Sequence, residues 1–287
     1  MKLIETLIEI YIKLIALFSN QKAADVTFLL FQKTQPRKMS ADEIKFYSET
    51  EHYTIESDIE PIEVYTKGPK DGELFILLHG WNSNLARLSH IVDVLVRQGY
   101  RCVLFDMPGH GKSILKHTNL KKNSLVFEAV LNHLNPQQTF NVLTHSFGSI
   151  IASLTLANTH YQLNHLIYMT SLDRIEPIFE ELKRRLKLKD AVYSKIVSKA
   201  DSLLQEPLKG IAVVNKTEAV NYQYLSLFHD KHDKILDFKN SELLNESLNN
   251  STLYAYENIG HSRMLSNAEL LKDLEELIKE KAPVELV

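Results

Sequence analysis

The sequence predicts an α/β fold in which a mostly parallel, twisted β-sheet carries helices on both faces. From about residue 74 onward, short apolar segments alternate with segments of helical spacing, and this alternation implies parallel strands joined by helical crossovers. The segment 74–78 is a continuous apolar run, as expected for a strand that is buried on both faces. Five of the nine glycines lie in loops that directly follow strand candidates. Such loops are where open parallel sheets bind their ligands.

Length and composition restrict the number of domains, the possible partners and the cellular compartment. The chain has 287 residues, enough for one large α/β domain with an inserted cap or for two small domains. Its formal net charge of −3 gives no indication of nucleic-acid binding, for which a basic surface is expected. The single cysteine, Cys102, lies in a strand candidate and has no partner within the chain. A reducing compartment is therefore expected, which predicts a cytoplasmic protein, with membrane association as an option.

Residues 1–50 are predicted to form a helical N-terminal extension, and residues 51–287 the main domain. Within residues 1–18, charged side chains recur at helical spacing and form one narrow polar stripe, made of Lys2, Glu5, Glu9 and Lys13. These charges argue against a signal peptide and against a spanning helix. The wide apolar remainder predicts either packing against the main domain or a contact of residues 1–18 with a membrane surface or a second copy of the chain.

The remaining elements follow in order. A second helix is predicted at 23–32, and Ser40 with Glu43 has the spacing of a capping box that begins a short third helix. Strands are expected at 53–56, 62–65, 74–78, 102–105, 140–143, 166–169, 224–228 and 253–256. Helices are expected at 85–97, 124–134, 149–158, 176–186 and 191–204, with a last one opening at Ser266. The helical, charged stretch at about 173–220 interrupts the alternation after the sixth strand, so it predicts an inserted lid.

Polar side chains and glycines gather directly after the strand candidates. The runs are His79-Gly-Trp81, Asp106-Met-Pro-Gly-His-Gly-Lys-Ser113, His145-Ser-Phe-Gly148, His229-Asp-Lys-His-Asp233 and Gly260-His261. Ser146 stands in a tight turn between two apolar runs, where a buried strand passes directly into a helix. The side chain of a serine at that apex projects away from the turn, and the first N–H groups of the helix lie beside it. This geometry suits a nucleophile whose attack generates an oxyanion.

These motifs, in this order, resemble those of the α/β-hydrolase superfamily over about residue 62 to the C-terminus. The chain looks most like small bacterial-type serine hydrolases of the esterase and lipase kind, with a helical N-terminal extension and a short cap. The resemblance implies that Ser146 is the nucleophile, Asp233 the acid and His261 the base, in the superfamily's chain order. It also implies an oxyanion hole made by the backbone N–H groups of Trp81 and Phe147.

The chemistry requires each of these groups. A serine hydroxyl is a weak nucleophile near neutral pH, so His261 would take its proton and later protonate the leaving group. Asp233 would fix the imidazole tautomer and stabilise the imidazolium. Neither a cofactor nor a metal ion is required. We therefore expect a carboxylesterase-like serine hydrolase that cleaves esters of small or medium acyl groups through an acyl-enzyme. Thioesterase, lactonase and acyltransferase activities use the same triad, and a ligand-binding or scaffold protein with little turnover is the alternative.

Two other aspartates are alternative acids. Asp173 directly follows the sixth strand, and Asp230 lies three residues before Asp233. The spacing of His229 and His232 matches no zinc signature, so no metal site is predicted.

Two further positions carry structural expectations. Thr144 stands where the superfamily motif has a glycine, and a β-branched residue there is expected to require a backbone adjustment. His79 is expected to orient the loop that supplies the oxyanion donor.

Overall fold

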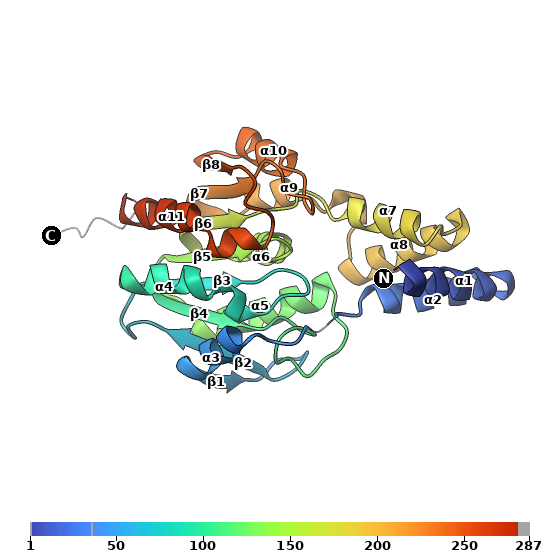
Figure 1. The fold of residues 1–287 in the computed structure, drawn as a ribbon, viewed down its shortest axis with the longest axis horizontal. Coiled ribbons are helices and arrows are strands. Elements are labelled where there is room, and N and C mark those ends of the chain that lie inside the picture. The colour runs from blue at the N-terminus through green and yellow to red at the C-terminus, as the bar shows by residue number, and fades with distance from the viewer. Residues whose placement is uncertain (1, 36, 281–287) are drawn as a thin grey trace.

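The computed structural model describes residues 2–35 and 37–280, and these residues contain one eight-stranded sheet in the order β1-β2-β4-β3-β5-β6-β7-β8 (Figure 1). The strands are β1 Glu51–Ile55, β2 Ile62–Lys67, β3 Leu74–Leu78, β4 Arg101–Phe105, β5 Phe140–His145, β6 Gln162–Met169, β7 Asn221–Asp230 and β8 Ser251–Tyr256. β2 pairs antiparallel with both β1 and β4, and every other pair is parallel. The predicted α/β fold with a mostly parallel sheet is confirmed. The predicted main domain runs to residue 287, and its last seven residues lie outside the described part.

Helices cover both faces of this sheet. The helices of the described part, some of which lie beside the sheet, are α1 Lys2–Phe18, α2 Asn20–Phe31, α3 Ala41–Glu49, α4 Ser89–Arg97, α5 Leu120–Leu134, α6 Gly148–Leu156, α7 Glu176–Arg185, α8 Asp190–Leu204, α9 Val213–Glu218, α10 Lys239–Ser247 and α11 Ala268–Glu280. Three short 3₁₀ segments, η1 Leu85–Leu88, η2 Leu208–Gly210 and η3 Arg263–Ser266, lie between them. The predicted helix at 85–97 is thus one 3₁₀ turn followed by α4.

The central strand β3 shows how one apolar run supplies two cores. Ile76 and Leu78 belong to the core under α5 and α6, whereas Phe75 and Leu77 belong to the core under α4 and α11. All four side chains are fully buried. Because successive side chains of a strand point to opposite faces, a strand between two helical layers must be apolar at every position.

Local capping decides where the helices begin. The predicted capping box is present, because the Ser40 hydroxyl accepts from the Glu43 N–H and the Glu43 carboxylate accepts from the Ser40 N–H. α5 begins at Leu120, four residues earlier than predicted, because the side chain of Asn119 accepts from the Lys122 N–H.

The helical stretch after the sixth strand lies between β6 and β7 and contains α7, α8, η2 and α9. α2 packs against both α1 and α8, so α1, α2, α7 and α8 form a helical lobe beside the sheet (Figure 1). Within the described residues, no helix has the length and hydropathy needed to span a membrane.

Candidate active site

Ser146 occupies a strained turn between β5 and α6. Its φ of +54° is in the left-handed region, which non-glycine residues rarely adopt and which costs on the order of 1 kcal/mol or more. Its N–H donates to the carbonyl of Met169 at 2.9 Å, which anchors the apex to β6. A Cβ atom at Gly148 would lie 2.9 Å from the Leu78 carbonyl oxygen. Glycine is therefore needed there for α6 to start against β3.

The structure brings Ser146, His261 and Asp233 together at the carboxyl ends of β5, β8 and β7. His261 Nε2 lies 3.0 Å from Ser146 Oγ, and His261 Nδ1 lies 2.7 Å from Asp233 Oδ2. A carboxylate only accepts, so the Nδ1–H must be the donor to Asp233. Nε2 is then left unprotonated and can accept the serine proton, which is the tautomer that a general base needs.

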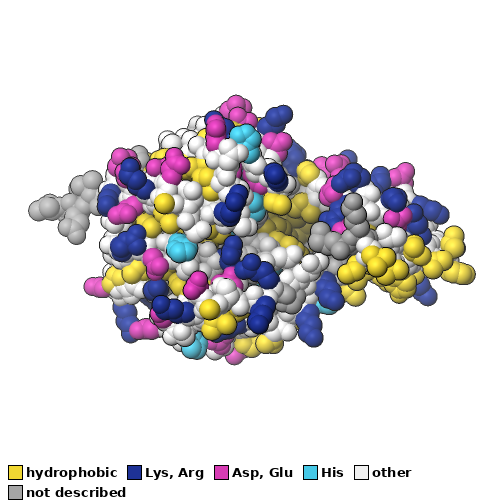
Figure 2. Space-filling view, viewed as in Figure 1, with side chains coloured by type: hydrophobic (Ala, Val, Ile, Leu, Met, Phe, Trp, Pro, Cys, Tyr) yellow, Lys and Arg dark blue, Asp and Glu magenta, His cyan; other side chains and the backbone are white. Residues whose placement is uncertain are grey.

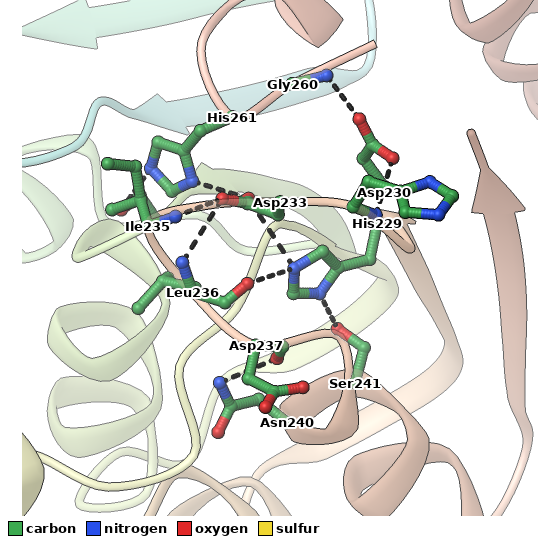
Figure 3. Close-up of polar contacts among 12 residues, drawn as sticks. His229, Asp230, Asp233, Ile235, Leu236, Asp237, Asn240, Ser241, Gly260 and His261 are labelled. Atoms are coloured by element: carbon green, nitrogen blue, oxygen red, sulfur yellow. Dashed lines mark hydrogen bonds and ion pairs between the residues drawn. The ribbon is translucent and has the colours of Figure 1, made fainter. Parts of the chain in front are cut away.

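The carboxylate of Asp233 is fully buried and saturated with donors (Figure 3). Its Oδ1 accepts from the N–H groups of Ile235 at 2.7 Å and Leu236 at 3.2 Å, and its Oδ2 lies 3.6 Å from His229 Nε2. Burial alone would raise the pKa of this carboxyl. Hydrogen bonds from His229, His261 and the Ile235 amide outweigh burial and hold the pKa below its ordinary value.

His229 supports the acid from a buried position at the end of β7. Its Nδ1 lies 2.7 Å from the Ser241 hydroxyl, and its Nε2 lies 3.1 Å from the Leu236 carbonyl. Since the carbonyl can only accept, Nε2 carries the proton and Nδ1 accepts from Ser241. His229 thereby ties the Asp233 loop to α10, a role that no pattern in the sequence indicates.

The two alternative acids lie elsewhere. Asp230 accepts the backbone N–H groups of His232 at 2.9 Å, Asn258 at 3.0 Å and Gly260 (Figure 3). Burial tends to raise the pKa of Asp230, but these hydrogen bonds lower it overall. Because Gly260 precedes His261, the Asp230 carboxylate joins the loop of the acid to the loop of the base.

Asp173 has other partners. Its Oδ2 pairs with Arg174 at 3.1 Å, and its backbone carbonyl accepts from Val213 at 2.6 Å. Neither Asp173 nor Asp230 is hydrogen-bonded to His261, so Asp233 is the carboxylate in position to orient the His261 imidazole.

The expected oxyanion donors are the backbone N–H groups of Trp81 and Phe147. Neither the Trp81 N–H nor the Phe147 N–H donates to another residue among those described. The two side-chain rings meet edge to face, with centroids 5.2 Å apart, and Trp81 lines the cavity at Ser146. These amides are therefore free to donate to a substrate oxygen.

His79 holds the loop that carries Trp81. Its Nε2 accepts from the Met107 N–H at 3.0 Å, so the proton is on Nδ1, which donates to the Gly80 carbonyl at 2.8 Å. Burial lowers the pKa of His79 to about 4, which keeps the ring neutral and this tautomer fixed near neutral pH.

A cavity of about 140 Å³ opens beside Ser146 and His261. Several of its lining residues come from the N-terminal extension, namely Thr34, Gln35, Arg37 and Met39. The Thr34 hydroxyl donates to the Gly109 carbonyl at 2.6 Å, and the Gln35 N–H donates to Asn82 Oδ1 at 2.9 Å. These long-range contacts had no signal in the sequence. None of the described lining residues comes from 173–220, so a lid role for that segment stays a prediction.

Thr144 fits the sheet without the expected backbone adjustment. It pairs in register with Leu78 of β3 and Tyr168 of β6, and the one register shift between β5 and β6 lies at 140–142. The side chain is fully buried, and its hydroxyl has no hydrogen-bond partner among the described residues.

Comparisons with known proteins agree with this architecture. Residues 73–210 match a family model described as alpha/beta hydrolase fold. A serine hydrolase-like protein of Dictyostelium discoideum is 28% identical over 121 residues, which are 40% of this chain; the match spans only 33% of that relative's length.

Solved structures show the same fold. An esterase of Pyrococcus furiosus superposes with a TM-score of 0.63 at 17% identity, covering 87% of this chain and 95% of that one. Est1E of Butyrivibrio proteoclasticus, solved with ferulic acid, superposes with a TM-score of 0.63 at 17% identity, covering 80% and 98%. Together with the sheet order and the family-model match, this likeness shows that the chain has the α/β-hydrolase fold.

Proposed function

We propose that this protein is a serine hydrolase that cleaves carboxylic esters of small or medium acyl groups through an acyl-enzyme intermediate. The observation that carries the proposal is the continuous hydrogen-bonded path from Ser146 Oγ to His261 at 3.0 Å and on to Asp233 at 2.7 Å. A turn serine without a catalytic role needs neither a correctly protonated imidazole nor a buried carboxylate behind that imidazole.

In the proposed reaction, Ser146 Oγ attacks the ester carbonyl while its proton moves to His261 Nε2. The imidazolium, stabilised by Asp233, then gives this proton to the departing alkoxide, and the bond between carbonyl carbon and alcohol oxygen breaks. Water, deprotonated by the same nitrogen, attacks the acyl-enzyme. The acid is released, and the serine regains its proton.

The negative charge of each tetrahedral intermediate would be held by the Trp81 and Phe147 amides. Removing one donor of this type typically raises the activation barrier by about 3 kcal/mol, which is a hundredfold or more in rate. Because both donors belong to the main chain, the backbone of the His79–Gly80 loop and the start of α6 set their positions.

The size of the cavity supports a modest substrate. A volume of about 140 Å³ holds on the order of ten water molecules, which is room for a small ester. The Pyrococcus furiosus structure described above is that of an esterase, which supports an ester over other acyl donors.

The test is a panel of 4-nitrophenyl esters of increasing acyl length, with matched thioester and lactone substrates, assayed on the wild type and on Ser146→Ala. We expect highest kcat/KM for short acyl esters, a pre-steady-state burst of nitrophenol, and no activity above background for Ser146→Ala. Hydrolysis that survives in Ser146→Ala would refute the mechanism. A folded wild type that hydrolyses no substrate of the panel would favour the alternative function, a ligand-binding or scaffold protein with little turnover.

A further inference from the structure

The outward side of α1 is apolar, which is unusual for a helix on a protein surface. Eight large side chains form this α1 apolar face: Leu3, Ile4, Leu7, Ile10, Tyr11, Leu14, Leu17 and Phe18. They range from 49% exposed at Ile10 to 91% exposed at Phe18. Their spacing of three and four residues places them on one stripe of the helix. Figure 2 shows apolar side chains gathered at the outer end of the helical lobe.

The rotation of α1 about its axis is fixed by contacts within the chain. On the inward side, Ile12 is buried, and Ile8 and Ile15 pack against the core. The polar stripe turns toward α7 and the loop after it, where Glu5 pairs with Arg185, and Glu9 pairs with Lys187 at 3.2 Å. The side chain of Lys2 lies outside the described part. With the core on one side and ion pairs on another, the apolar face is left on the outside.

A basic segment packs against the polar stripe of the same helix, through Glu5 and Glu9. Five of the seven residues at 183–189 are cationic: Lys183, Arg184, Arg185, Lys187 and Lys189. The first four pair with acids, yet their side chains remain 38–74% exposed. Exposed ion pairs contribute little stability, so these cations can exchange an acid for a lipid phosphate.

The charge of the chain is also unevenly distributed, with an excess of cations in the helical lobe. Residues 1–35 and 173–210 contain 13 Lys and Arg against 10 Asp and Glu, whereas the remainder contains 20 against 26. The helical lobe is thus the cationic end of an otherwise acidic protein.

We propose that the α1 apolar face and the basic segment 183–189 together bind the surface of an anionic lipid bilayer, with α1 lying flat in the interface. An apolar helix face and a polybasic patch are the two signals that make peripheral binding stable. Tyr11 and Phe18 supply aromatic rings of the kind that bind at the boundary between headgroups and acyl chains.

Charge favours a bilayer over a second copy of the chain as the occupant. In a two-fold symmetric dimer the same face covers itself, so the cationic helical lobe of one copy would approach that of the other. Like charges brought together in this way oppose association, whereas an anionic lipid surface attracts them.

The experiment is co-sedimentation of the full chain with two kinds of vesicle, phosphatidylcholine alone and phosphatidylcholine with phosphatidylserine at about three to one. A face variant carries Leu7→Gln, Leu14→Gln and Phe18→Gln, and glutamine preserves helix propensity at these exposed positions. A charge variant carries Arg184→Gln, Lys187→Gln and Lys189→Gln.

A matched control carries Ile44→Gln and Ile114→Gln. These two side chains are 58% and 75% exposed and lie outside the helical lobe. The control therefore removes exposed apolar surface without altering the α1 apolar face.

We expect the wild type and the control to bind the mixed vesicles more tightly than phosphatidylcholine alone. The face variant should lose about a hundredfold in partition coefficient on both vesicles. The charge variant should lose about tenfold or more on the mixed vesicles only. The rate of hydrolysis of a soluble ester should be the same in the wild type and in the three variants, so this test is independent of the catalytic proposal.

Two results would overturn the inference. One is a wild type that remains in the supernatant with both vesicle types. The other is a wild type that is a dimer in sedimentation equilibrium while the face variant is a monomer, because a second copy would then cover the face.

Discussion

The change Asp233→Asn should abolish catalysis by reversing the tautomer of His261. Oδ1 of Asp233 accepts two backbone N–H groups, from Ile235 at 2.7 Å and Leu236 at 3.2 Å. An asparagine must keep its carbonyl oxygen at that position, because an NH₂ group would face two donors. Its NH₂ group is therefore forced to the Oδ2 position, 2.7 Å from His261 Nδ1.

Two donors cannot share that contact, so the imidazole must carry its proton on Nε2 instead. Nε2 lies 3.0 Å from Ser146 Oγ and, once protonated, can no longer accept the serine proton. The expected loss is about 10⁴-fold in kcat, or roughly 5.5 kcal/mol of barrier, with little change in KM.

The assay is steady-state hydrolysis of a short-chain 4-nitrophenyl ester, with circular dichroism to show that each variant is folded. Asp173→Asn serves as the matched control, since that carboxylate pairs with Arg174 at 3.1 Å and has no bond to His261. It should retain activity within a few fold. The reasoning is refuted if Asp233→Asn keeps more than about a tenth of the wild-type kcat, or if Asp173→Asn loses as much as Asp233→Asn.

Three further predictions concern stability. Thr144→Val keeps the side-chain shape and removes a buried hydroxyl that has no partner among the described residues, so the free energy of unfolding should rise by about 1 kcal/mol in urea denaturation; a clear decrease would contradict this. Gly148→Ala places a Cβ 2.9 Å from the Leu78 carbonyl oxygen, so it should lower the free energy of unfolding by about 1–3 kcal/mol and impair ester hydrolysis, and a variant matching wild type in both would argue against the close approach. Burial lowers the pKa of His110 from 6.5 to about 3, so below about pH 6.5 the unfolded chain binds a proton that the folded chain excludes. The contribution of His110 to the free energy of unfolding is therefore complete above about pH 6.5 and decreases at lower pH. At pH 5 the decrease from this residue is about 2 kcal/mol. His110→Asn, which retains a donor for the Pro108 carbonyl, should flatten the decrease of the midpoint temperature between pH 7 and pH 5, and an unchanged decrease would count against this source.

The sheet and the residues at its carboxyl edge could be predicted from the sequence because the patterns that indicate them are local. A strand buried on both faces must be apolar throughout, as β3 is, and a strand that turns directly into a helix requires small residues such as Gly148. Ser146, His261 and Asp233 each follow a strand, and parallel strands bring such residues to one edge of the sheet.

The remaining features depend on contacts between distant segments. Nothing near Thr34 or Arg37 in the sequence indicates that these residues line the cavity, because their positions are set by contacts with the strand-end loops, such as that of Thr34 with Gly109. The role of Asp230 in positioning His261 likewise depends on the backbone of Gly260, thirty residues later. The amphipathic pattern of residues 1–18 shows a polar stripe but does not say which side faces the protein. The burial of Ile12 and the ion pair between Glu5 and Arg185 reveal this.

The most direct test of the central claim is to label the protein with a fluorophosphonate and measure its intact mass. Our interpretation predicts one covalent adduct per chain, located by peptide mapping on Ser146 and absent from Ser146→Ala. An adduct at another residue, or equal labelling of Ser146→Ala, would contradict the assignment of this serine as the nucleophile that His261 activates.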